Sequence, residues 1–397
     1  MEEWKEYKLG DVLCEKGYVR GPFGSALKRG DLLNEGIPVY EQQHAIYNKR
    51  EFRFYISNEK YNEMKRFTVY PEDIIISCSG TVGEVSLIKN EDPQGIISQA
   101  LLLLRANKNI ILPEYLLYFF KTAKGHNSIT SRSSGSVQVN IARREVIESI
   151  PLSLPSLDIQ KKIVKTLKSL DDKIELNNRI NHNLEEQAQA LYKSWFIDFE
   201  PFKDGKFVDS ELGMIPEGWT VKNLLELSNV FDSKRKPLSG NERSVMDKIY
   251  PYYGATSIMD YVSGYIFDGT YLLMGEDGSV ITDEGFPFLQ YVTGKFWPNN
   301  HAHVLQGKNG YSTEMLHCAL LRKVVKASVT GAVQAKISQA NMAKILFPFP
   351  SSEILKQFDD YIQVIYCQLR NIVEQNKNLT ITRDQLLPKL LSGAITC

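Results

Sequence analysis

The chain has 397 residues, with 47 Lys and Arg against 47 Asp and Glu, and a formal net charge of zero. This length accommodates two or three domains, and the charge balance argues against nucleic-acid binding through the whole surface while permitting a local basic face. Apolar runs such as residues 100–104 are too short to cross a bilayer, and the charged N-terminus lacks a signal-peptide core. The five cysteines show no CxxC spacing. We therefore expect a cytoplasmic protein without a membrane segment or a zinc ribbon.

The first domain is predicted over residues 1–155, and its opening, WKEYKLGDV, alternates apolar and polar residues as a short strand does. Residues 17–31 (GYVRGPFGSALKRGD) predict an irregular loop. Backbone N–H groups and cations on such a loop can contact phosphates, although an ordinary surface turn explains the same composition. The polar and basic candidates in this stretch are Arg20, Ser25, Lys28 and Arg29.

Residues 37–47 (IPVYEQQHAIY) predict a strand that ends near Tyr40 and delivers Gln42, Gln43 and His44 to a loop. Glutamine can pair with adenine edges and histidine can donate to guanine, although amide side chains are also common on loops without this role. Residues 71–83 predict a buried strand followed by a tight loop that carries Thr81.

The remainder of the first domain predicts a buried strand over Ile96–Arg105 and a short helix over Tyr115–Lys121. A polar, basic loop follows over residues 130–138, and it carries Arg132 and Ser133.

A long helix is predicted over the central region, residues 156–200. No proline or glycine interrupts residues 157–199, and apolar residues recur at alternating steps of four and three, which is typical of a helix that pairs with another helix. The span from Ile163 to Trp195 would be about 50 Å long. The seam residues are Ile163, Leu167, Leu170, Ile174, Asn177, Asn181, Leu184, Ala188, Leu191 and Trp195.

Turn-forming residues over 201–218 predict a linker, and a second domain over 219–350 repeats the plan of the first. WTVKNLLEL echoes the opening strand, YPYYGAT follows IPVYEQQ, and GEDGSV takes the place of SGTVGE. Residues 233–237 (SKRKP) form a basic loop, and the DNA-contact candidates on the loops of the second domain are Lys234, Arg235, Lys236, Thr256, Glu276, Asp277 and His301.

A second helix is predicted over residues 351–397, with seam positions 195 residues after those of the first helix. Asn181 thus corresponds to Asn376, and a buried Asn facing Asn would fix the register, although both could instead lie on a solvated face. Arg383 places a charge in this seam, and Pro388 should end or kink the helix. The seam residues are Phe358, Ile362, Ile365, Leu369, Ile372, Asn376, Leu379, Arg383, Leu386 and Leu390.

The sequence therefore predicts a tandem duplication. GAVQAKI, from Gly331, repeats GSVQVNI, from Gly135, at a distance of 196 residues. We expect an α/β (mixed α+β) fold with two globular domains, each followed by a long helix. The two helices should pair as an antiparallel coiled coil with pseudo-twofold symmetry.

Catalytic motifs do not emerge from the sequence. It contains neither the Asn/Asp-Pro-Pro-aromatic tetrapeptide of DNA methyltransferases nor the GxxxxGK[ST] motif of P-loop ATPases. His301 and His303 would share one face of a strand, and Asp268, Glu276 or Asp277 could approach them. No third ligand has diagnostic spacing, so we predict no metal site and no catalytic residues.

Six ordered segments resemble the specificity subunits of type I restriction-modification systems. They are WKEYKLGDV, GPFGSALK, GSVQVNI, LPSLDIQKKIV, KIELNNRINHNLEEQAQALYKSWF and ELGMIPEGW. The resemblance implies two target recognition domains that each read one half of a split double-stranded DNA sequence. It also implies that the helices separate these domains and bind two modification subunits, and that restriction subunits join through the complex.

The same resemblance implies that the chain itself is not catalytic. S-adenosylmethionine, ATP and magnesium would belong to partner subunits. The outer faces of both helices, including Lys161, Lys165, Glu175 and Gln368, are candidate partner surfaces, although ordinary solvated positions explain these residues equally well. The alternative interpretation is a coiled-coil scaffold or regulator without a DNA role.

Overall fold

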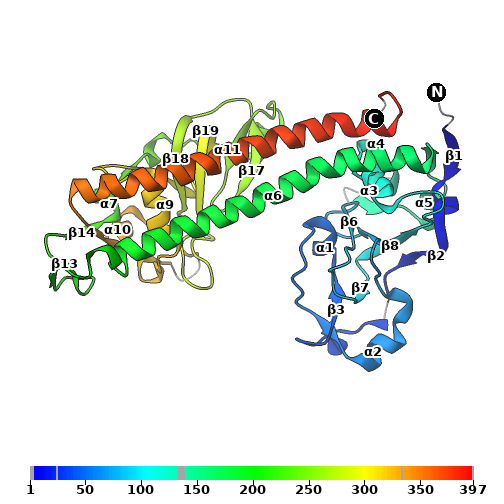
Figure 1. Cartoon of the computed structure of the whole chain (residues 1–397), viewed down its shortest axis with the longest axis horizontal. Helices are drawn as coiled ribbons and strands as arrows, with labels where there is room; N and C mark the ends of the chain where they lie inside the picture. The colour runs from blue at the N-terminus through cyan, green and yellow to red at the C-terminus, as the bar shows by residue number, and fades with distance from the viewer. Residues whose placement is uncertain (1–3, 24–25, 133–138, 332–333, 396–397) are drawn as a thin grey trace. The chain divides into compact units, whose positions relative to one another are not determined.

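The computed structural model describes residues 4–23, 26–132, 139–331 and 334–395. It divides into two compact units: the first unit comprises Met1–Glu175 with Lys377–Cys397, and the second unit comprises Leu176–Asn376. Helices α6 (Leu157–Phe196) and α11 (Ser352–Leu391) are the two longest elements (Figure 1). Each of them has residues in both units, so a compact unit is one globular domain together with part of both helices.

Two sheets form the core of the first unit. The four-stranded sheet has the order β2 (Leu13–Arg20), β8 (Leu101–Ala106), β5 (Ile74–Ser77) and β6 (Val85–Leu87). The three-stranded sheet has the order β4 (Tyr55–Ile56), β3 (Ile37–Tyr40) and β7 (Ile96–Ile97). Strands β5 and β8 are apolar along most of their length because both faces of this sheet are covered.

The single strand predicted over Ile96–Arg105 is in fact two strands. β7 pairs in parallel with β3, whereas β8 pairs with β2 and β5 in the other sheet. The chain turns between them, where the Leu101 N–H donates to the Ser98 carbonyl at 3.2 Å. An apolar run cannot reveal this change of sheet, because both strands are equally buried.

The other elements of the first unit surround these sheets. β1 (Lys5–Lys8) pairs with β11 (Pro151–Leu154), which leads directly into α6, and β9 (Thr130–Arg132) pairs with β10 (Val139–Ile141). The short helices are α1 (Gln42–Ile46), α2 (Asn58–Glu63), α3 (Pro113–Lys121), α4 (Ala123–Ile129) and α5 (Arg144–Glu148).

The second unit is built around one six-stranded sheet. Its order is β15 (Ser228–Val230), β20 (Ala302–Gly307), β18 (Phe267–Gly275), β19 (Leu289–Pro298), β16 (Tyr250–Tyr253) and β17 (Ile258–Val262). β14 (Thr220–Asn223) pairs with β21 (Leu346–Phe349). The short helices are α7 (Leu224–Leu227), α8 (Gly240–Ser244), α9 (Thr313–Leu321) and α10 (Gln339–Met342).

The internal repeat extends to backbone hydrogen bonds. The β1–β11 pair of the first unit has its counterpart in the β14–β21 pair of the second unit. The Leu9 N–H donates to the Ile150 carbonyl at 2.9 Å, and the Leu224 N–H donates to the Ile345 carbonyl at 2.9 Å. Helices α3 and α9 are also counterparts, since each has nine residues and each follows a six-residue strand, β8 or β20.

The predicted linker is an ordered part of the second unit. β12 (Phe207–Val208) and β13 (Ile215–Pro216) form a hairpin within it. Phe202 packs edge-on against Trp195 and Trp219, with ring centroids 5.8 Å and 5.1 Å apart. Turn residues therefore mark a compact hairpin that packs on the end of α6.

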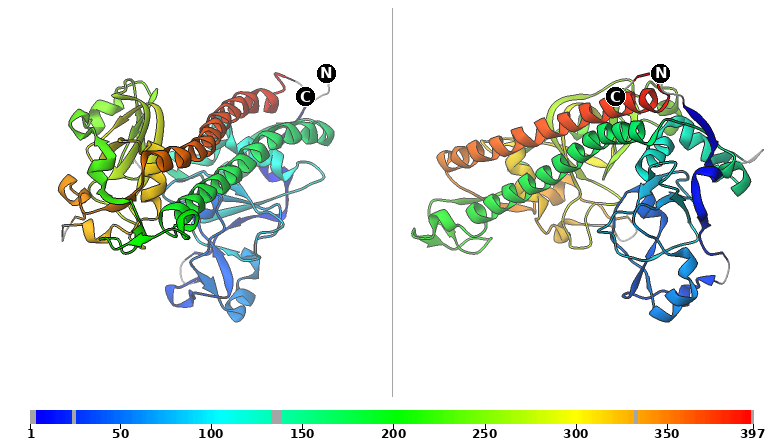
Figure 2. Two further views of the ribbon diagram at one scale, coloured as in Figure 1. Left: turned by 60° about the vertical axis from the view of Figure 1, so that its left-hand side comes forward. Right: turned by 45° about the vertical axis from the view of Figure 1, so that its right-hand side comes forward.

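Helices α6 and α11 lie side by side in all views (Figures 1 and 2). In the first unit, Ile163 and Leu167 share a core cluster with Leu387 and Leu390. In the second unit, the Trp195 ring lies 5.5 Å from that of Phe358. Early residues of α6 thus meet late residues of α11, and the pair is antiparallel. All seam residues named from the sequence are buried or partly buried.

The predicted contact between Asn181 and Asn376 is wrong. Asn177 donates instead, to Asn376 Oδ1 at 2.8 Å and to Gln375 Oε1 at 2.7 Å, and Asn376 donates to Asn178 at 2.9 Å. In an antiparallel pair the residue number rises along one helix and falls along the other, so residues related by the repeat do not face each other. Asn181 Oδ1 is buried without a hydrogen-bond partner among the described residues.

Arg383 and Pro388 are the two residues of the second helix that depart from the seam pattern, and α11 accommodates both of them. Arg383 donates to Asp171 at 2.8 Å and also pairs with Asp384, so the seam charge is an ion pair between the helices. Pro388 does not end α11, which continues to Leu391. Its neighbours Leu387 and Leu390 are buried in the core of the first unit, and this packing offsets the hydrogen bond that proline cannot donate.

Within the described residues, we find no helix long and apolar enough to cross a membrane.

Candidate nucleic-acid interface

Several strand ends of the first unit meet at one edge of its sheets. The Gly21 N–H donates to the Leu101 carbonyl at 2.9 Å, the Ser98 N–H to the Tyr40 carbonyl at 2.8 Å, and the Cys78 N–H to the Ala100 carbonyl at 2.8 Å. These bonds bring together the segments that follow β2, β3 and β5 and the turn before β8. We call the segments 21–28, 41–46, 78–84 and 98–100, without residues 24–25, the first loop face.

Arg20 anchors this face at the end of β2. Its guanidinium donates to the Leu101 carbonyl at 3.0 Å and lies 5.5 Å from the centre of the Phe23 ring, which is exposed. Burial raises the pKa of the nearby Cys78 thiol to about 11, against the opposing charge of Arg20. Burial therefore favours the neutral thiol over the more nucleophilic thiolate.

Lys28 is the last residue of its segment in the first loop face, Arg29 directly follows it, and both are exposed. The backbone N–H of Lys28 donates to Asp31 at 2.8 Å, which fixes the short turn that begins at Arg29. Both cations are thus held on an ordered backbone and are accessible to solvent, as phosphate contacts require.

The segment with Gln42, Gln43 and His44 is a helical turn, α1, and not the loop that we predicted. The Glu41 N–H donates to His44 Nδ1 at 2.7 Å, so the histidine ring caps the turn. The amide of Gln42 lies beside the 79–83 loop, since a Cβ added to Gly80 would be 3.4 Å from Gln42 Nε2. Gln42 Oε1 is buried without a hydrogen-bond partner among the described residues, whereas Gln43 is partly exposed.

His44 is not available to DNA, contrary to the sequence-based prediction. Its side chain is fully buried, its Nε2 atom lies 3.0 Å from the Glu51 carbonyl, and its ring stacks on Phe52 with centroids 4.6 Å apart. Burial also lowers the pKa of His44. The sequence shows a polar side chain after a strand, but it does not show that the following turn needs that side chain as a cap.

Thr81 is exposed at the tip of a hydrogen-bonded turn. The Ser77 hydroxyl donates to the Thr81 carbonyl at 2.6 Å and accepts from the Glu84 N–H at 3.0 Å. Gly80 has a φ of +62° and so provides the left-handed backbone that this turn requires. Ser25 and Ser133 lie outside the described residues, and so does the side chain of Arg132, whose backbone belongs to β9.

The second unit has an equivalent edge. The Phe231 N–H donates to the Val304 carbonyl at 2.8 Å, the Glu276 N–H to the His301 carbonyl at 2.9 Å, and the Asn299 N–H to the Tyr253 carbonyl at 2.9 Å. We call the segments 231–238, 254–257, 276–280 and 299–301 the second loop face. It contains all seven DNA-contact candidates of the second domain.

Arg235 and Glu276 form an internal ion pair within this face. Arg235 donates to Glu276 Oε2 at 2.6 Å and to the Ala302 carbonyl at 2.7 Å, and only 12% of its side chain is exposed. Lys336 lies 3.2 Å from the other oxygen of Glu276. The structure therefore corrects the predicted role of Arg235 and Glu276, because these groups tie the loops together and are largely satisfied within the protein.

His303 and Asp232 form the buried centre of this network. Sequence reasoning considered His303 beside His301 on one face of a strand and missed Asp232. His303 Nδ1 lies 2.6 Å from Asp232 Oδ2, and His303 Nε2 lies 2.7 Å from the Ile337 carbonyl. Burial opposes the ionisation of Asp232, but hydrogen bonds from His303 and from the Val304 N–H outweigh it and lower the pKa of this carboxyl. A histidine inside the apolar run of β20 was the available signal, because a buried imidazole needs polar partners.

Ligand atoms of Asp232, Glu276 and His303 all lie within 4.8 Å of one another, a composition that could hold a metal ion. His303 already uses both ring nitrogens, and Arg235 and Lys336 neutralise Glu276. An ion-pair network accounts for the cluster without a metal. His301 does not join it: His301 contacts Asp277 instead, and Asp268 lies toward the opposite end of β18.

Among the remaining candidates of the second domain, Lys234, Lys236, Thr256 and His301 are exposed, and Asp277 is partly exposed. The ammonium group of Lys234 lies 5.1 Å from the centre of the Phe231 ring, and the Lys236 carbonyl accepts from the Trp297 indole at 2.6 Å. Thr256 lies in a turn closed by the Gly254 N–H, which donates to the Ser257 carbonyl at 2.8 Å. Lys234 and Lys236 are thus ordered, accessible cations, as are Lys28 and Arg29 in the first unit.

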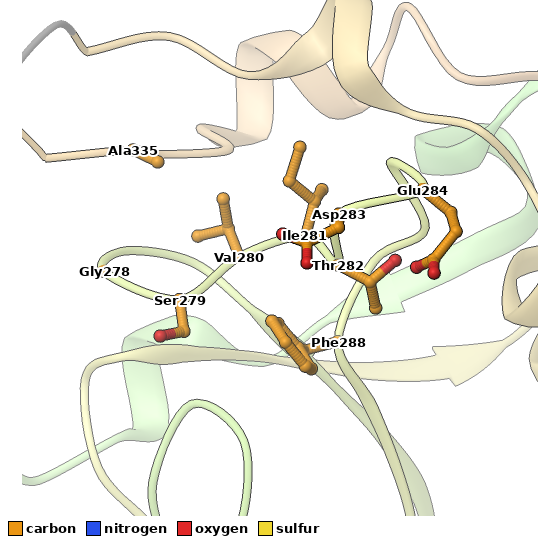
Figure 3. A pocket seen from close by; sticks show the side chains of 9 residues that line it. All are labelled: Gly278, Ser279, Val280, Ile281, Thr282, Asp283, Glu284, Phe288 and Ala335. Atoms are coloured by element: carbon orange, nitrogen blue, oxygen red, sulfur yellow. The ribbon is translucent and has the colours of Figure 1, made fainter. Parts of the chain in front are cut away.

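A pocket of about 480 Å³ adjoins the second loop face (Figure 3). Residues 278–284 supply most of its lining, with Phe288 and Ala335. Figure 3 shows that Val280 points toward the segment of Ala335, whereas the Ser279 hydroxyl points away from it. The lining combines backbone, the hydroxyl groups of Ser279 and Thr282, the carboxylates of Asp283 and Glu284, and apolar side chains.

The family described as "Type I restriction modification DNA specificity domain" matches residues 1–186 and 216–379. The chain belongs to this family. The two matches correspond to the two domains with the helical region that follows each of them.

Relatives in the type I family span the whole chain. The HindI specificity subunit of Haemophilus influenzae is 24% identical over 100% of both chains. The MjaIX specificity subunit of Methanocaldococcus jannaschii is 26% identical over 99% of this chain and 94% of that one. The crystal structure of a type I S subunit from M. genitalium covers 98% of this chain and 96% of that chain, with a TM-score of 0.53 and 15% identity. This last comparison shows a shared fold.

Proposed function

We propose that each of the two domains reads one half of a bipartite double-stranded DNA target. Family membership gives the chain its general function, which is DNA sequence specificity in a type I restriction-modification system. The finer proposal is carried by one observation: the same edge of the sheet core carries a loop face in both units, with equivalent backbone hydrogen bonds. Two equivalent faces suit two separate half-sites.

Exposed cations and polar tips supply the chemistry of each face. Lys28 and Arg29 in the first domain, and Lys234 and Lys236 in the second, would contact phosphates. Base reading would fall to exposed or partly exposed polar residues such as Gln43, Thr81, Thr256 and His301. Arg235, Glu276 and His44 would act indirectly, because they hold these loops in place. The zero net charge suits a subunit that shares phosphate binding with partners.

The helices would act as a ruler and as a docking surface. A 40-residue helix is about 60 Å long, which is enough to hold two half-sites about 34 Å, or one turn of DNA, apart. Two modification subunits would bind the exposed sides of the helices, where Tyr361 and Val364 are 59% and 60% exposed. Lys161, Lys165 and Gln368 are also exposed on these helices, and Glu175 is exposed but lies 3.6 Å from Lys89 of the first domain.

Catalysis would belong to the partners. Members of this family carry specificity and are not themselves catalytic. S-adenosylmethionine would bind a modification subunit, which would flip an adenine out of the duplex, and ATP and magnesium would serve the restriction subunits. The complex would act on DNA in the cytoplasm. Family membership removes the alternative of a scaffold or regulator without a DNA role.

The test is genome-wide mapping of adenine methylation in cells that carry the chain with its modification partner, compared with cells that lack the chain. The proposal predicts one motif, made of two short half-sites around a fixed unread gap, that disappears with the chain. A motif without a gap would contradict the two-reader proposal. If no motif disappears, DNA binding by the co-purified complex distinguishes an inactive system from a wrong assignment.

A further inference from the structure

Three positions on each long helix face the domain that precedes the helix in the chain. On α6 they are Gln160, Asp171 and Glu175, and on α11 they are Leu355, Tyr366 and Arg370, each 195 residues later. Steps of eleven and four residues place all three on one side of a helix. The α6 positions and the first domain belong to the first unit, and the α11 positions and the second domain belong to the second unit. The seam positions are similarly apolar in the two helices, but these three positions differ in chemistry.

The first position contacts the segment before α3 or α9. Gln160 is fully buried, donates to the Ile110 and Pro155 carbonyls at 3.0 Å each, and accepts from the Leu112 N–H at 3.0 Å. Leu355 is equally buried, and its Cδ1 atom lies 3.6 Å from where a Cβ on Gly310 would be. The first domain therefore needs a polar side chain at this position, and the second needs an apolar one.

The second position contacts the sixth residue of α3 or α9. Asp171 accepts from the Tyr118 hydroxyl at 2.8 Å. Its counterpart Tyr366 lies 3.4 Å from Cys318 Sγ, and its hydroxyl is 2.7 Å from His317 Nδ1. The large aromatic residue thus comes from the domain in the first unit and from the helix in the second. If Asp171 and Tyr366 were exchanged, two tyrosines would face each other in the first unit, and a cavity would remain beside Cys318 in the second unit.

The third position carries opposite charges. Glu175 lies 3.6 Å from Lys89 of the first domain. Arg370 donates to Glu314 Oε1 at 2.9 Å and to the Tyr291 hydroxyl at 2.7 Å in the second domain. Only 8% of the Glu314 side chain is exposed, so an acidic residue in place of Arg370 would leave a buried carboxylate unpaired.

We infer that each long helix is matched to its own domain through these three positions, so that the two domains are not interchangeable along the chain. We call Gln160, Asp171 and Glu175 the α6 key, and Leu355, Tyr366 and Arg370 the α11 key. The seams are mostly apolar but differ at Asn177 and Arg383, whose counterparts are Ile372 and Ala188, and the keys add a difference in the contacts that each helix makes with its own domain. A consequence that rests on the proposed function is that the order of the half-sites is fixed.

Four full-length chains test this inference. The natural second domain, residues 219–350, is either kept or replaced by a second copy of residues 4–155, so that both junctions retain their natural Trp and Pro-Ser residues. Each version carries either the α11 key or the α6 key, introduced as Leu355→Gln, Tyr366→Asp and Arg370→Glu. The readouts are the unfolding temperature and the resistance of the second-position domain to limited proteolysis.

We expect both matched chains to resist proteolysis and both mismatched chains to unfold about 5 °C lower or more. Equal stability of all four chains would overturn the inference, and so would a duplicated domain that gains nothing from the α6 key. Neither readout involves DNA, so the result does not depend on the proposed function. If the proposed function were wrong, methylation mapping would show no motif that disappears with the chain, whatever the stability measurements show.

A smaller cycle covers the case in which the duplicated chain does not fold. In the natural chain, Asp171→Tyr and Tyr118→Cys should each lower the unfolding temperature. Together they recreate the pair that α11 makes with Cys318, and the double variant should recover part of the loss. Strictly additive losses would show that these residues are not a matched pair.

Discussion

At the scale of single residues, the polar side chains of the two loop faces divide into those that hold loops and those that remain accessible. His44 caps a helical turn, and Arg235 joins two loops through Glu276. Lys28 and Lys234 are exposed on ordered backbone. Tight polar loops must satisfy their own buried groups first, so residue type alone overestimates the number of DNA contacts.

Lys28→Ala should weaken DNA binding at all sequences alike and reduce the salt dependence of binding by about one counterion, as loss of a phosphate contact does. Binding of the co-purified complex at several salt concentrations measures this slope. The matched control is Lys108→Ala, an exposed lysine just beyond the opposite end of β8. An unchanged slope for Lys28→Ala would remove Lys28 from the interface.

His317 should make the second unit sensitive to pH. Burial lowers the pKa of His317 to about 4 from an ordinary value of 6.5. The folded state therefore binds fewer protons than the unfolded state between these values, and stability should fall by about 3 kcal/mol as the pH drops from 6.5 to 4.

Unfolding of the His317→Gln variant, measured across this pH range, checks the expectation. The variant should show a clearly flatter pH dependence than the natural chain. Some slope should remain, since burial lowers the pKa of His44 in the same direction. His182→Gln, an exposed histidine on α6, is the control and should leave the slope unchanged.

At the scale of elements, the interface between the two helices is an apolar seam interrupted by a polar layer, which consists of Asn177, Gln375 and Asn376. Asn177 is 1% exposed and donates to two side chains of α11. A buried polar contact of this kind specifies one register because every shifted alignment leaves it unpaired. The ion pair between Asp171 and Arg383 adds a second register-specific contact in the first unit.

Asn177→Ala should destabilise the chain by about 1–2 kcal/mol, because Gln375 Oε1 and Asn376 Oδ1 lose their donor. The midpoint of urea unfolding measures this effect. Asn378→Ala removes an exposed asparagine from α11 and should shift the midpoint little. Equal midpoints for the two variants would mean that the polar layer contributes nothing to stability.

At the scale of the whole molecule, the tandem repeat and the family match point to two readers on one chain. Exchange of residues 1–150 for the corresponding domain of another specificity subunit should change one half-site of the methylation motif and leave the other half-site intact. Methylation mapping of the exchanged chain gives the answer directly. A change in both half-sites would mean that the two domains read DNA jointly.

Much of the fold followed from the sequence alone. A heptad seam over each helix, a shift of 195 residues and paired turn motifs are local patterns, and they determined the duplication, the long helices and the absence of an obvious catalytic motif. Local periodicity is sufficient to predict a long paired helix, because a helix buries the same face wherever its partner lies.

Only the tertiary structure decided which residues face one another. It replaced Asn181 with Asn177 opposite Asn376, split the strand predicted over Ile96–Arg105 between two sheets, and placed His44 and His303 inside the protein. It also revealed that the three positions of the α6 key and the three of the α11 key make different contacts with their domains. Each of these depends on contacts between residues far apart in the chain, which local patterns cannot encode, because burial and hydrogen-bond partners are set by the packing of the whole unit.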